Sequence, residues 1–190
     1  MSISVKEEIR ELIRHFQKGY IERDLKNLEE FMNLFTDEVE VIGTNGSYPG
    51  QNEWYLDKEG VKGLVQGDWE DWGDLRIKEE GIRIREQNGV GWIALPGTVK
   101  KYIGEENYQS YLEYVKDYVE EAGISAKQKL HNILRGGTNT VFELNRGEKF
   151  VWPIRITAVV VKEEKKWKFT QMCFSFSTTY FPDEREFEEK

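Results

Sequence analysis

The chain of 190 residues has little of what builds covalent, metal or phosphate sites: one cysteine, two histidines and four prolines. The lone cysteine, Cys173, cannot form a disulfide within the chain. His15 and His131 are far apart in the sequence, and neither belongs to an HxxE or CxxC pattern. No glycine-rich phosphate loop is present either. We therefore expect no metal site and no cofactor.

Long apolar runs are also missing. No segment approaches the roughly 20 apolar residues of a membrane-spanning helix, and the first residues lack the charged-then-apolar pattern of a secretion signal. Positive charge is outnumbered: the chain has 27 basic and 35 acidic residues, so its formal net charge is −8. Polyanions bind such a surface poorly. The sequence thus predicts a cytoplasmic protein that binds neither membranes nor nucleic acid.

Aromatic residues are abundant: six tryptophans, nine tyrosines and ten phenylalanines, in a chain that is 38% hydrophobic. A chain of this length and composition is most simply one domain with a sizeable core. We place that domain at residues 1–182 and interpret 183–190 as an acidic tail.

Apolar spacing predicts helices at the start of the chain. Ser4 and Glu7 form a capping box ahead of a helix with one apolar stripe, and a second helix follows Asp24. From residue 38 the period changes to two, which predicts a strand over 38–44. A further short helix is expected after Asp57.

Strands dominate the rest of the chain, with one interruption. Residues 75–85 and 91–102 predict two curved strands joined at Asn88-Gly89, a strong hairpin signal. Residues 105–137 predict two helices, which we interpret as an insertion, and 138–144 predict a further strand. Three positions are open to this helical pair: across the open end of the domain, along a sheet edge, or in a dimer contact.

Two long runs rich in β-branched and aromatic residues, 150–161 and 167–180, end the chain. The polar segment between them, Lys162 to Lys166, fits a surface turn. These two runs therefore predict a C-terminal hairpin of long strands.

Several segments resemble the SnoaL-like branch of the NTF2-like, or ketosteroid isomerase-like, superfamily. They occur in the family's order and are Arg23-Asp24-Leu25, Phe35–Thr44, Asp68–Asp74, Arg155–Val159 and Trp167–Phe176. The resemblance implies an α+β cone in which a curved antiparallel sheet packs on N-terminal helices, with a helical insertion at about 105–137. It also implies a cavity between sheet and helices, and a homodimer formed through the outer face of the sheet.

The candidate ligand-binding residues follow from this resemblance and from strand parity. They are Tyr20, Trp54, Arg155, Thr157, Gln171, Cys173 and Ser175. The five on the last two strands share one face by simple alternation, and the family's pattern directs that face inward. A buried Arg155 would need a ligand anion or, more commonly, a structural partner such as Glu40.

Simpler interpretations stand beside the ligand role for other members of this set. Tyr20 completes the apolar stripe of the first helix and can be a core residue. Cys173 is by default an inert, small, buried side chain.

The resemblance argues against ketosteroid isomerase chemistry, which uses an Asp base and an oxyanion hole of Tyr and protonated Asp. The base position falls at Gly43 or Thr44, and the second Asp position falls near Val159. Both carboxylates are missing. We therefore expect a small apolar or anionic molecule to bind in the cone. Two alternatives stay open: an isomerase, dehydratase or cyclase using Tyr20, Glu40 or another carboxylate, and a non-catalytic dimerisation or assembly module whose cavity is filled by side chains.

Overall fold

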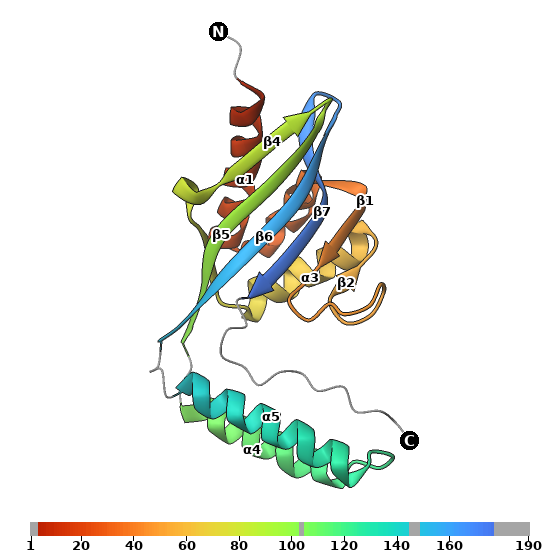
Figure 1. Ribbon diagram of the computed structural model, residues 1–190, viewed down its shortest axis with the longest axis vertical. Helices are drawn as coiled ribbons and strands as arrows, with labels where there is room; N and C mark the ends of the chain where they lie inside the picture. The colour runs from red at the N-terminus through yellow and green to blue at the C-terminus, as the bar shows by residue number, and fades with distance from the viewer. Residues whose placement is uncertain (1–3, 103–104, 145–148, 177–190) are drawn as a thin grey trace.

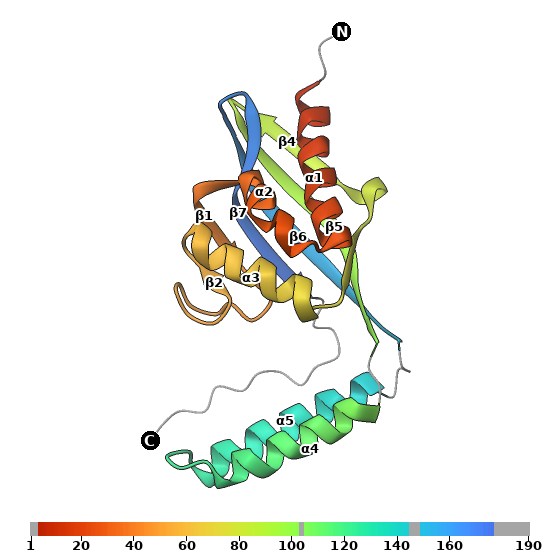
Figure 2. The same cartoon turned by 180° about the vertical axis from the view of Figure 1, so that it is seen from behind.

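The computed structural model describes residues 4–102, 105–144 and 149–176. In this part of the chain a seven-stranded sheet has the order β2-β1-β7-β6-β5-β3, with β4 also paired to β5. Helices α1 and α3 and the short helical turns between α1 and β1 cover one face of the sheet, and the other face is open (Figures 1 and 2). The α+β class expected from the sequence is confirmed.

The elements have the following bounds. The helices are α1 (Val5–Glu22), α2 (Leu28–Phe31), α3 (Lys58–Asp71), α4 (Glu105–Glu120) and α5 (Ala126–Leu144), with single 3-10 turns at Leu25–Asn27, Met32–Leu34 and Glu79–Gly81. The strands are β1 (Phe35–Ile42), β2 (Trp54–Tyr55), β3 (Asp74–Ile77), β4 (Arg83–Gln87), β5 (Val90–Tyr102), β6 (Lys149–Glu163) and β7 (Lys166–Phe176). Strand β1 runs parallel to β7, so the sheet is mixed rather than wholly antiparallel.

Helix α1 forms where the capping box predicts it. The Ser4 hydroxyl accepts a hydrogen bond from the Glu7 amide, and Arg23 ends the helix in the left-handed conformation, with φ 49°. Its apolar stripe is buried and consists of Ile9, Leu12, Ile13, Phe16 and Tyr20. Helix α1 therefore supplies the layer that packs on the sheet.

The core between sheet and helices contains a cluster of aromatic rings among its aliphatic side chains. Phe16 of α1 lies 5.5 Å from Phe169 of β7, and Phe31 lies 4.9 Å from Trp69 of α3, measured between ring centroids. Phe169 is fully buried. Burying rings of this size is the largest apolar contribution that single side chains can make to folding.

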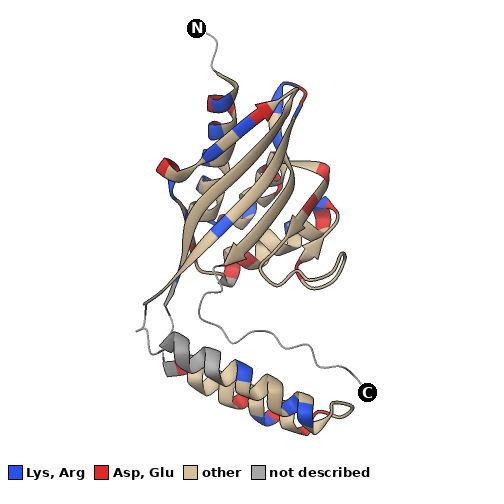
Figure 3. Ribbon diagram, in the orientation of Figure 1, with Lys and Arg blue, Asp and Glu red and all other residues tan. Residues whose placement is uncertain are grey.

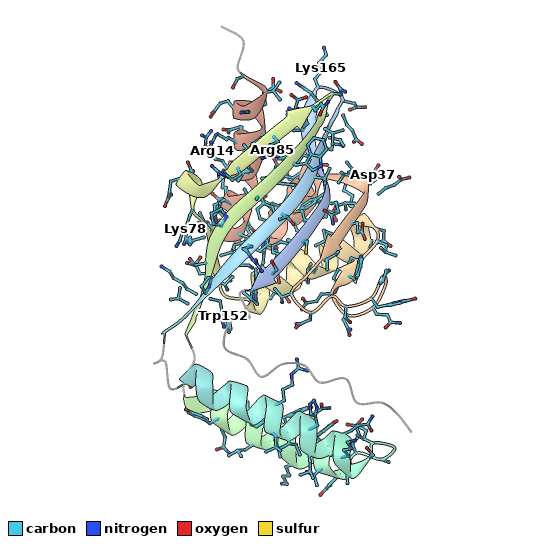
Figure 4. All side chains as sticks on the ribbon, in the orientation of Figure 1. Arg14, Asp37, Lys78, Arg85, Trp152 and Lys165 are labelled. Atoms are coloured by element: carbon cyan, nitrogen blue, oxygen red, sulfur yellow. The ribbon has the colours of Figure 1, made fainter. Side chains whose placement is uncertain are left out.

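The β6–β7 turn is tied to the start of α1. Lys162 and the indole N–H of Trp167 both donate to the Glu8 carboxylate, at 2.6 and 2.9 Å. The hydrogen bond from Lys162 is the main reason that the pKa of Glu8 lies below its usual range. Lys165 lies at the tip of this turn, at the opposite end of the sheet from Trp152 (Figure 4).

A β-bulge in β7 sets which side chains the helices cover. The register between β6 and β7 shifts between Val159 and Val160, so that Gln171 pairs with Val159 but Phe169 pairs with Val160. Thr170 is the extra residue, and it reverses the alternation of the strand. The residues buried against the helices are consequently Trp167, Phe169, Met172 and Phe174.

The helical insertion is a hairpin of α4 and α5, side by side beyond the far end of β5 and β6 and away from the other helices (Figures 1 and 2). Helix α5 continues to Leu144, so the strand expected at 138–144 is wrong. Gly136 lies against the Tyr111 ring, which a Cβ at this position would approach to 2.8 Å. Gly136 therefore allows the two helices to pack closely at this level.

No helix among the described residues is both long enough and apolar enough to span a bilayer. The expected strand at 177–180 and the acidic tail at 183–190 lie outside the described residues.

The bulge predicts opposite outcomes for two neighbouring residues of β7. Met172→Ala should lower the free energy of unfolding by about 2–5 kcal/mol, because it empties a fully buried site. Cys173→Ala, on the half-buried outer face, should cost under about 1.5 kcal/mol. Urea unfolding monitored by tryptophan fluorescence measures both. A larger cost for Cys173→Ala would contradict the assigned faces.

Candidate functional site

Tyr20 and Asp68 come together where the C-terminal ends of α1 and α3 approach each other. Tyr20 is the last member of the buried stripe of α1. Asp57 begins α3 by accepting from the Gly60 amide, and the spacing Val61, Val65, Trp69 then turns one side of α3 inward. Asp68 lies on the flank of that side and is half-buried. A helix face that is otherwise apolar thus carries a carboxyl group at its edge.

The hydrogen bond between them is short and buried. The Tyr20 hydroxyl donates to Asp68 Oδ2 at 2.7 Å, and the Tyr20 side chain is 1% exposed. Burial, followed by the charge of Asp68, raises the pKa of Tyr20 well above its ordinary value, so Tyr20 stays protonated as the donor. The Trp72 ring lies 6.5 Å from that of Tyr20 and 6.2 Å from that of Phe174, and closes one side.

The pKa of the Asp68 carboxyl is raised from its ordinary value to about 7. Burial is the main cause, and the negative charge of Glu53 acts in the same direction. The hydrogen bond from Tyr20 and the charge of Arg23 oppose these effects. A carboxyl group balanced between its two protonation states near neutrality can both donate and accept a proton.

Arg23 holds the two helix ends together beside this pair. Its guanidinium donates to the backbone carbonyls of Tyr20 at 3.1 Å, of Trp72 at 3.0 Å and of Gly73. The last of these fixes the chain as it leaves α3 and enters β3. Arg23 therefore positions both Tyr20 and Asp68, and its charge limits how far the pKa of Asp68 rises.

Glu53 provides the second carboxylate of this region. It accepts from the Asn45 backbone amide and from the Asn45 side-chain amide, each at 2.9 Å, and its side chain lies against Gly43. A Cβ at Gly43 would come within 2.5 Å of the Glu53 carboxylate, so the glycine is needed for this close approach. The carboxylate is thus held by the β1–β2 loop.

The structure does not gather the seven predicted ligand residues in one cavity. Of these seven residues, only Tyr20 lies on the side of the sheet that the helices cover. Register pairs place Arg155 beside Ser175 and Thr157 beside Cys173, on the face opposite to the buried Ile154 and Ile156. Gln171 is beside Glu40, whose carboxylate accepts the Trp54 indole N–H at 2.6 Å.

Six of the predicted residues therefore share the outer face of the sheet. The inward orientation expected for the five on β6 and β7 is wrong. In β7 the bulge at Thr170 breaks the alternation on which it was based, and in β6 the regularly alternating Ile154, Ile156 and Ala158 are the residues that face the helices. Arg155 is exposed, so it needs no buried counter-ion, and Glu40 pairs with Trp54 instead. Burial raises the pKa of the Cys173 thiol, which makes it less reactive.

Sequence reasoning missed Asp68 as a functional residue, although it lies in the Asp68–Asp74 segment that carries the family resemblance. The available signal was its position: a carboxylate three residues after the apolar Val65 and next to Trp69. The depth of burial and the contact with Tyr20, 48 residues away, could not be read from one sequence.

A groove of about 900 Å³ lies apart from this pair, between α1, the segment 24–34 and the β6–β7 turn. Its apolar base includes Leu12, Phe31 and Trp69, and its rim carries acidic side chains such as Glu11 and Glu22. None of the seven predicted ligand residues lines it. Among the described residues, no three metal-ligating side chains converge as a metal site would require.

The raised pKa of Asp68 has a consequence for stability. Between about pH 4 and pH 7 the folded protein keeps a proton on Asp68 that the unfolded chain has lost, so the free energy of unfolding falls as pH rises through this window. Asp68→Asn removes the titrating group and can still accept from Tyr20, so it should flatten this fall. Thermal and urea unfolding across the window measure the slope. Glu70→Gln, an exposed change in the same helix, should leave it unaltered.

Loss of Arg23 should weaken the junction of α1 and α3. Arg23→Ala should lower the free energy of unfolding by about 2–4 kcal/mol, because three carbonyls lose a charged donor. It should also raise the pKa of Asp68 further, because a nearby positive charge is lost. Arg76→Ala, whose exposed side chain pairs with Asp74, is the matched control and should change neither quantity appreciably. Equal effects in the two variants would contradict the role of Arg23.

Three solved structures show what the chain is similar to. An NTF2-like protein from Pseudomonas putida KT2440 is 11% identical, with a TM-score of 0.56 over 100% of this chain and 99% of that one. A protein from Streptomyces avermitilis provisionally named a dehydratase of the NTF2-like family is 10% identical, with a TM-score of 0.55 over 91% and 96%. One from Exiguobacterium sibiricum 255-15, provisionally named a Ca/calmodulin-dependent kinase II association domain, is 12% identical, with a TM-score of 0.54 over 95% and 99%.

No family model matches the sequence, and no curated protein matches it. Identities of 10–12% support a comparison of folds but not a comparison of activities. The order of elements, the mixed sheet and these structural matches agree with one another. The chain therefore has the NTF2-like α+β fold, as the resemblance in its sequence implied.

Proposed function

We propose that this chain binds a small, uncharged, polar molecule at the Tyr20–Asp68 pair. The observation that carries the proposal is a half-buried carboxyl group with a pKa of about 7, hydrogen-bonded to a buried tyrosine and bordered by the Trp72 ring. A hydroxyl group can form a hydrogen bond with such a carboxyl in either protonation state, and a carbonyl group can accept one from its protonated form. An aromatic wall supplies apolar contact for the rest of the ligand.

The charges of this region favour a neutral ligand over an anionic one. Asp68 and Glu53 repel an anion, and Arg23 is already engaged with three carbonyls. Arg155, which suggested an anion at the level of sequence, lies on the other face of the sheet. The proposal therefore keeps small-molecule binding and replaces the anionic ligand by a polar neutral one.

Proton transfer is the second candidate, and the pKa of Asp68 favours it. A group that is half protonated near neutrality is suited to general acid–base catalysis. Removal of water from a hydroxy compound, or isomerisation next to a carbonyl, needs one proton removed and one added, and a single carboxyl group can do both in turn. The name of the Streptomyces avermitilis neighbour points to the same reaction class for that protein.

The outer face of the sheet supports a separate proposal, homodimerisation. Trp92 of β5 is 48% exposed there and pairs in register with Val159 of β6. The middle parts of β5, β6 and β7 carry few charged residues (Figure 3). Association through this face would cover Trp92 together with Arg155, Thr157 and Cys173, so their ligand role and a dimer role exclude each other.

A binding screen tests the ligand proposal. Tryptophan fluorescence follows titration with small aromatic alcohols and ketones, and with carboxylates of matching size. We expect neutral compounds to bind in preference to carboxylates, and Tyr20→Phe and Asp68→Asn each to weaken binding at least tenfold. Thr157→Ala, on the outer face, is the control and should bind as the wild type does.

Two results would overturn the proposal. One is undiminished binding by folded Asp68→Asn and Tyr20→Phe proteins. The other is a preference for the carboxylates. Native mass spectrometry of the purified wild type and Asp68→Asn proteins adds an independent measurement, because a small molecule carried through purification should be lost from the variant alone.

A further inference from the structure

The α4–α5 hairpin exposes several large apolar side chains that have no part in the Tyr20–Asp68 site. Leu112 and Val119 of α4 are 60% and 53% exposed, and Leu130 and Leu134 of α5 are 60% and 67% exposed. Single exposed leucines are ordinary, but four on one small hairpin are not. They occur at spacings of seven and four, which place each pair on one stripe of its helix.

Contacts between the two helices fix the direction of these stripes. Tyr111 and Tyr118 of α4 face α5, since the Tyr111 hydroxyl donates to the Ile133 carbonyl and the Tyr118 hydroxyl accepts from the Asn132 side chain at 2.7 Å. On α5, Lys129 and Gly136 face α4.

Leu112 and Val119 each follow one of the inward tyrosines by one position, a rotation of about 100° around the helix. Leu130 follows Lys129 by the same step. In two antiparallel helices that face each other, the same sense of rotation leads to the same side. The two stripes therefore form one apolar face, which we call the hairpin face: Leu112, Val119, Leu130 and Leu134.

The same contacts set the level of each residue along the hairpin. Lys129 donates to the Val119 carbonyl at 2.7 Å, and Gly136 lies on the Tyr111 ring. Leu130 is thus about level with Val119, and Leu134 is about level with Leu112. Charged residues follow the same levels, so that Lys127 is near the level of Glu120 and Arg135 near that of Glu113.

Charge differs sharply between the two helices. Helix α4 has five acidic residues and one lysine, whereas Ala126–Gly137 of α5 has two lysines, one arginine and no acidic residue. Figure 3 shows both signs on the hairpin. A surface that is acidic along one edge and basic along the other is complementary to a copy of itself after a rotation of 180°.

We propose that the hairpin face binds the hairpin face of a second copy of this chain, which forms a four-helix bundle with its two-fold axis parallel to the helices. In this arrangement α4 of one copy lies over α5 of the other. Val119 then meets Leu130 and Leu112 meets Leu134 of the other copy, while Glu120 approaches Lys127. An axis across the helices would instead place α4 on α4 and bring like charges together.

The proposal is independent of the Tyr20–Asp68 site. The hairpin stands beyond the end of β5 and β6, so two copies can pair through it while the outer face of the sheet remains accessible (Figures 1 and 2). Association through both surfaces would give assemblies larger than a dimer. Association through the hairpin alone would give a dimer.

Sedimentation equilibrium of the full-length chain tests the pairing. We expect Leu130→Glu combined with Leu134→Glu to remove one association step and so to halve the limiting mass. Both side chains are exposed, so the variant should fold and keep the wild-type circular dichroism. Ser110→Glu, on the opposite side of α4, is the matched control and should leave the mass unchanged. An unchanged limiting mass in the folded double variant, or a wild type that is monomeric at every concentration, would overturn the proposal.

Two further variants test the arrangement of helices. Glu120→Lys should weaken association, and adding Lys127→Glu should restore it, because the pair is exchanged across the two-fold axis. In a Cys173→Ala background, mixed Val119→Cys and Leu130→Cys chains should form an intermolecular disulfide on oxidation. Cross-linking of Val119→Cys chains with themselves alone would show α4 against α4 and contradict the proposed axis.

Discussion

One additional residue in β7 determines what the helices of this protein can cover. Without the bulge at Thr170, simple alternation would place Gln171, Cys173 and Ser175 against the helices. With it, Phe169 and Met172 are both fully buried, and the aromatic core continues from α1 across the sheet. Gln171, Cys173 and Ser175 then lie on the outer face, and the Tyr20–Asp68 pair lies on the helix side.

The Tyr20–Asp68 pair depends on a meeting of two sequence motifs. Arg23, from the first, binds the carbonyls of Trp72 and Gly73, from the second. Each motif carried the family resemblance, and the structure brings them into contact just after α1, where Arg23 adopts the left-handed conformation. The same guanidinium restrains the pKa of Asp68 that burial raises. The Arg23 side chain therefore links the backbone of the two helix ends to the protonation of Asp68.

Sequence patterns were sufficient for the elements that depend on local signals. The capping box at Ser4, the helix after Asp57 and the turn at Asn88-Gly89 all lie at element boundaries of the structure. Sequence patterns failed where contacts between residues far apart in the sequence determine the local structure. The glycines at 136 and 137 resemble a helix end until Tyr111 is known to pack on them, and the bulge leaves no mark in β7 itself. Asp68 is ordinary in the sequence and becomes unusual only through its burial beside Tyr20.

The ribbon of β5 and β6 connects the two parts of the molecule. Among the described residues, the pairs Lys101–Phe150 and Tyr102–Lys149 lie past the last pair that β3 makes with β5, Asp74–Lys100, and past the last pair that β7 makes with β6, Ile154–Phe176. A two-stranded antiparallel ribbon twists more easily than a wide sheet. The twist of this short ribbon therefore contributes to the angle at which the hairpin is presented. Its compliance would let one rigid domain adapt to assemblies of different geometry without repacking its core.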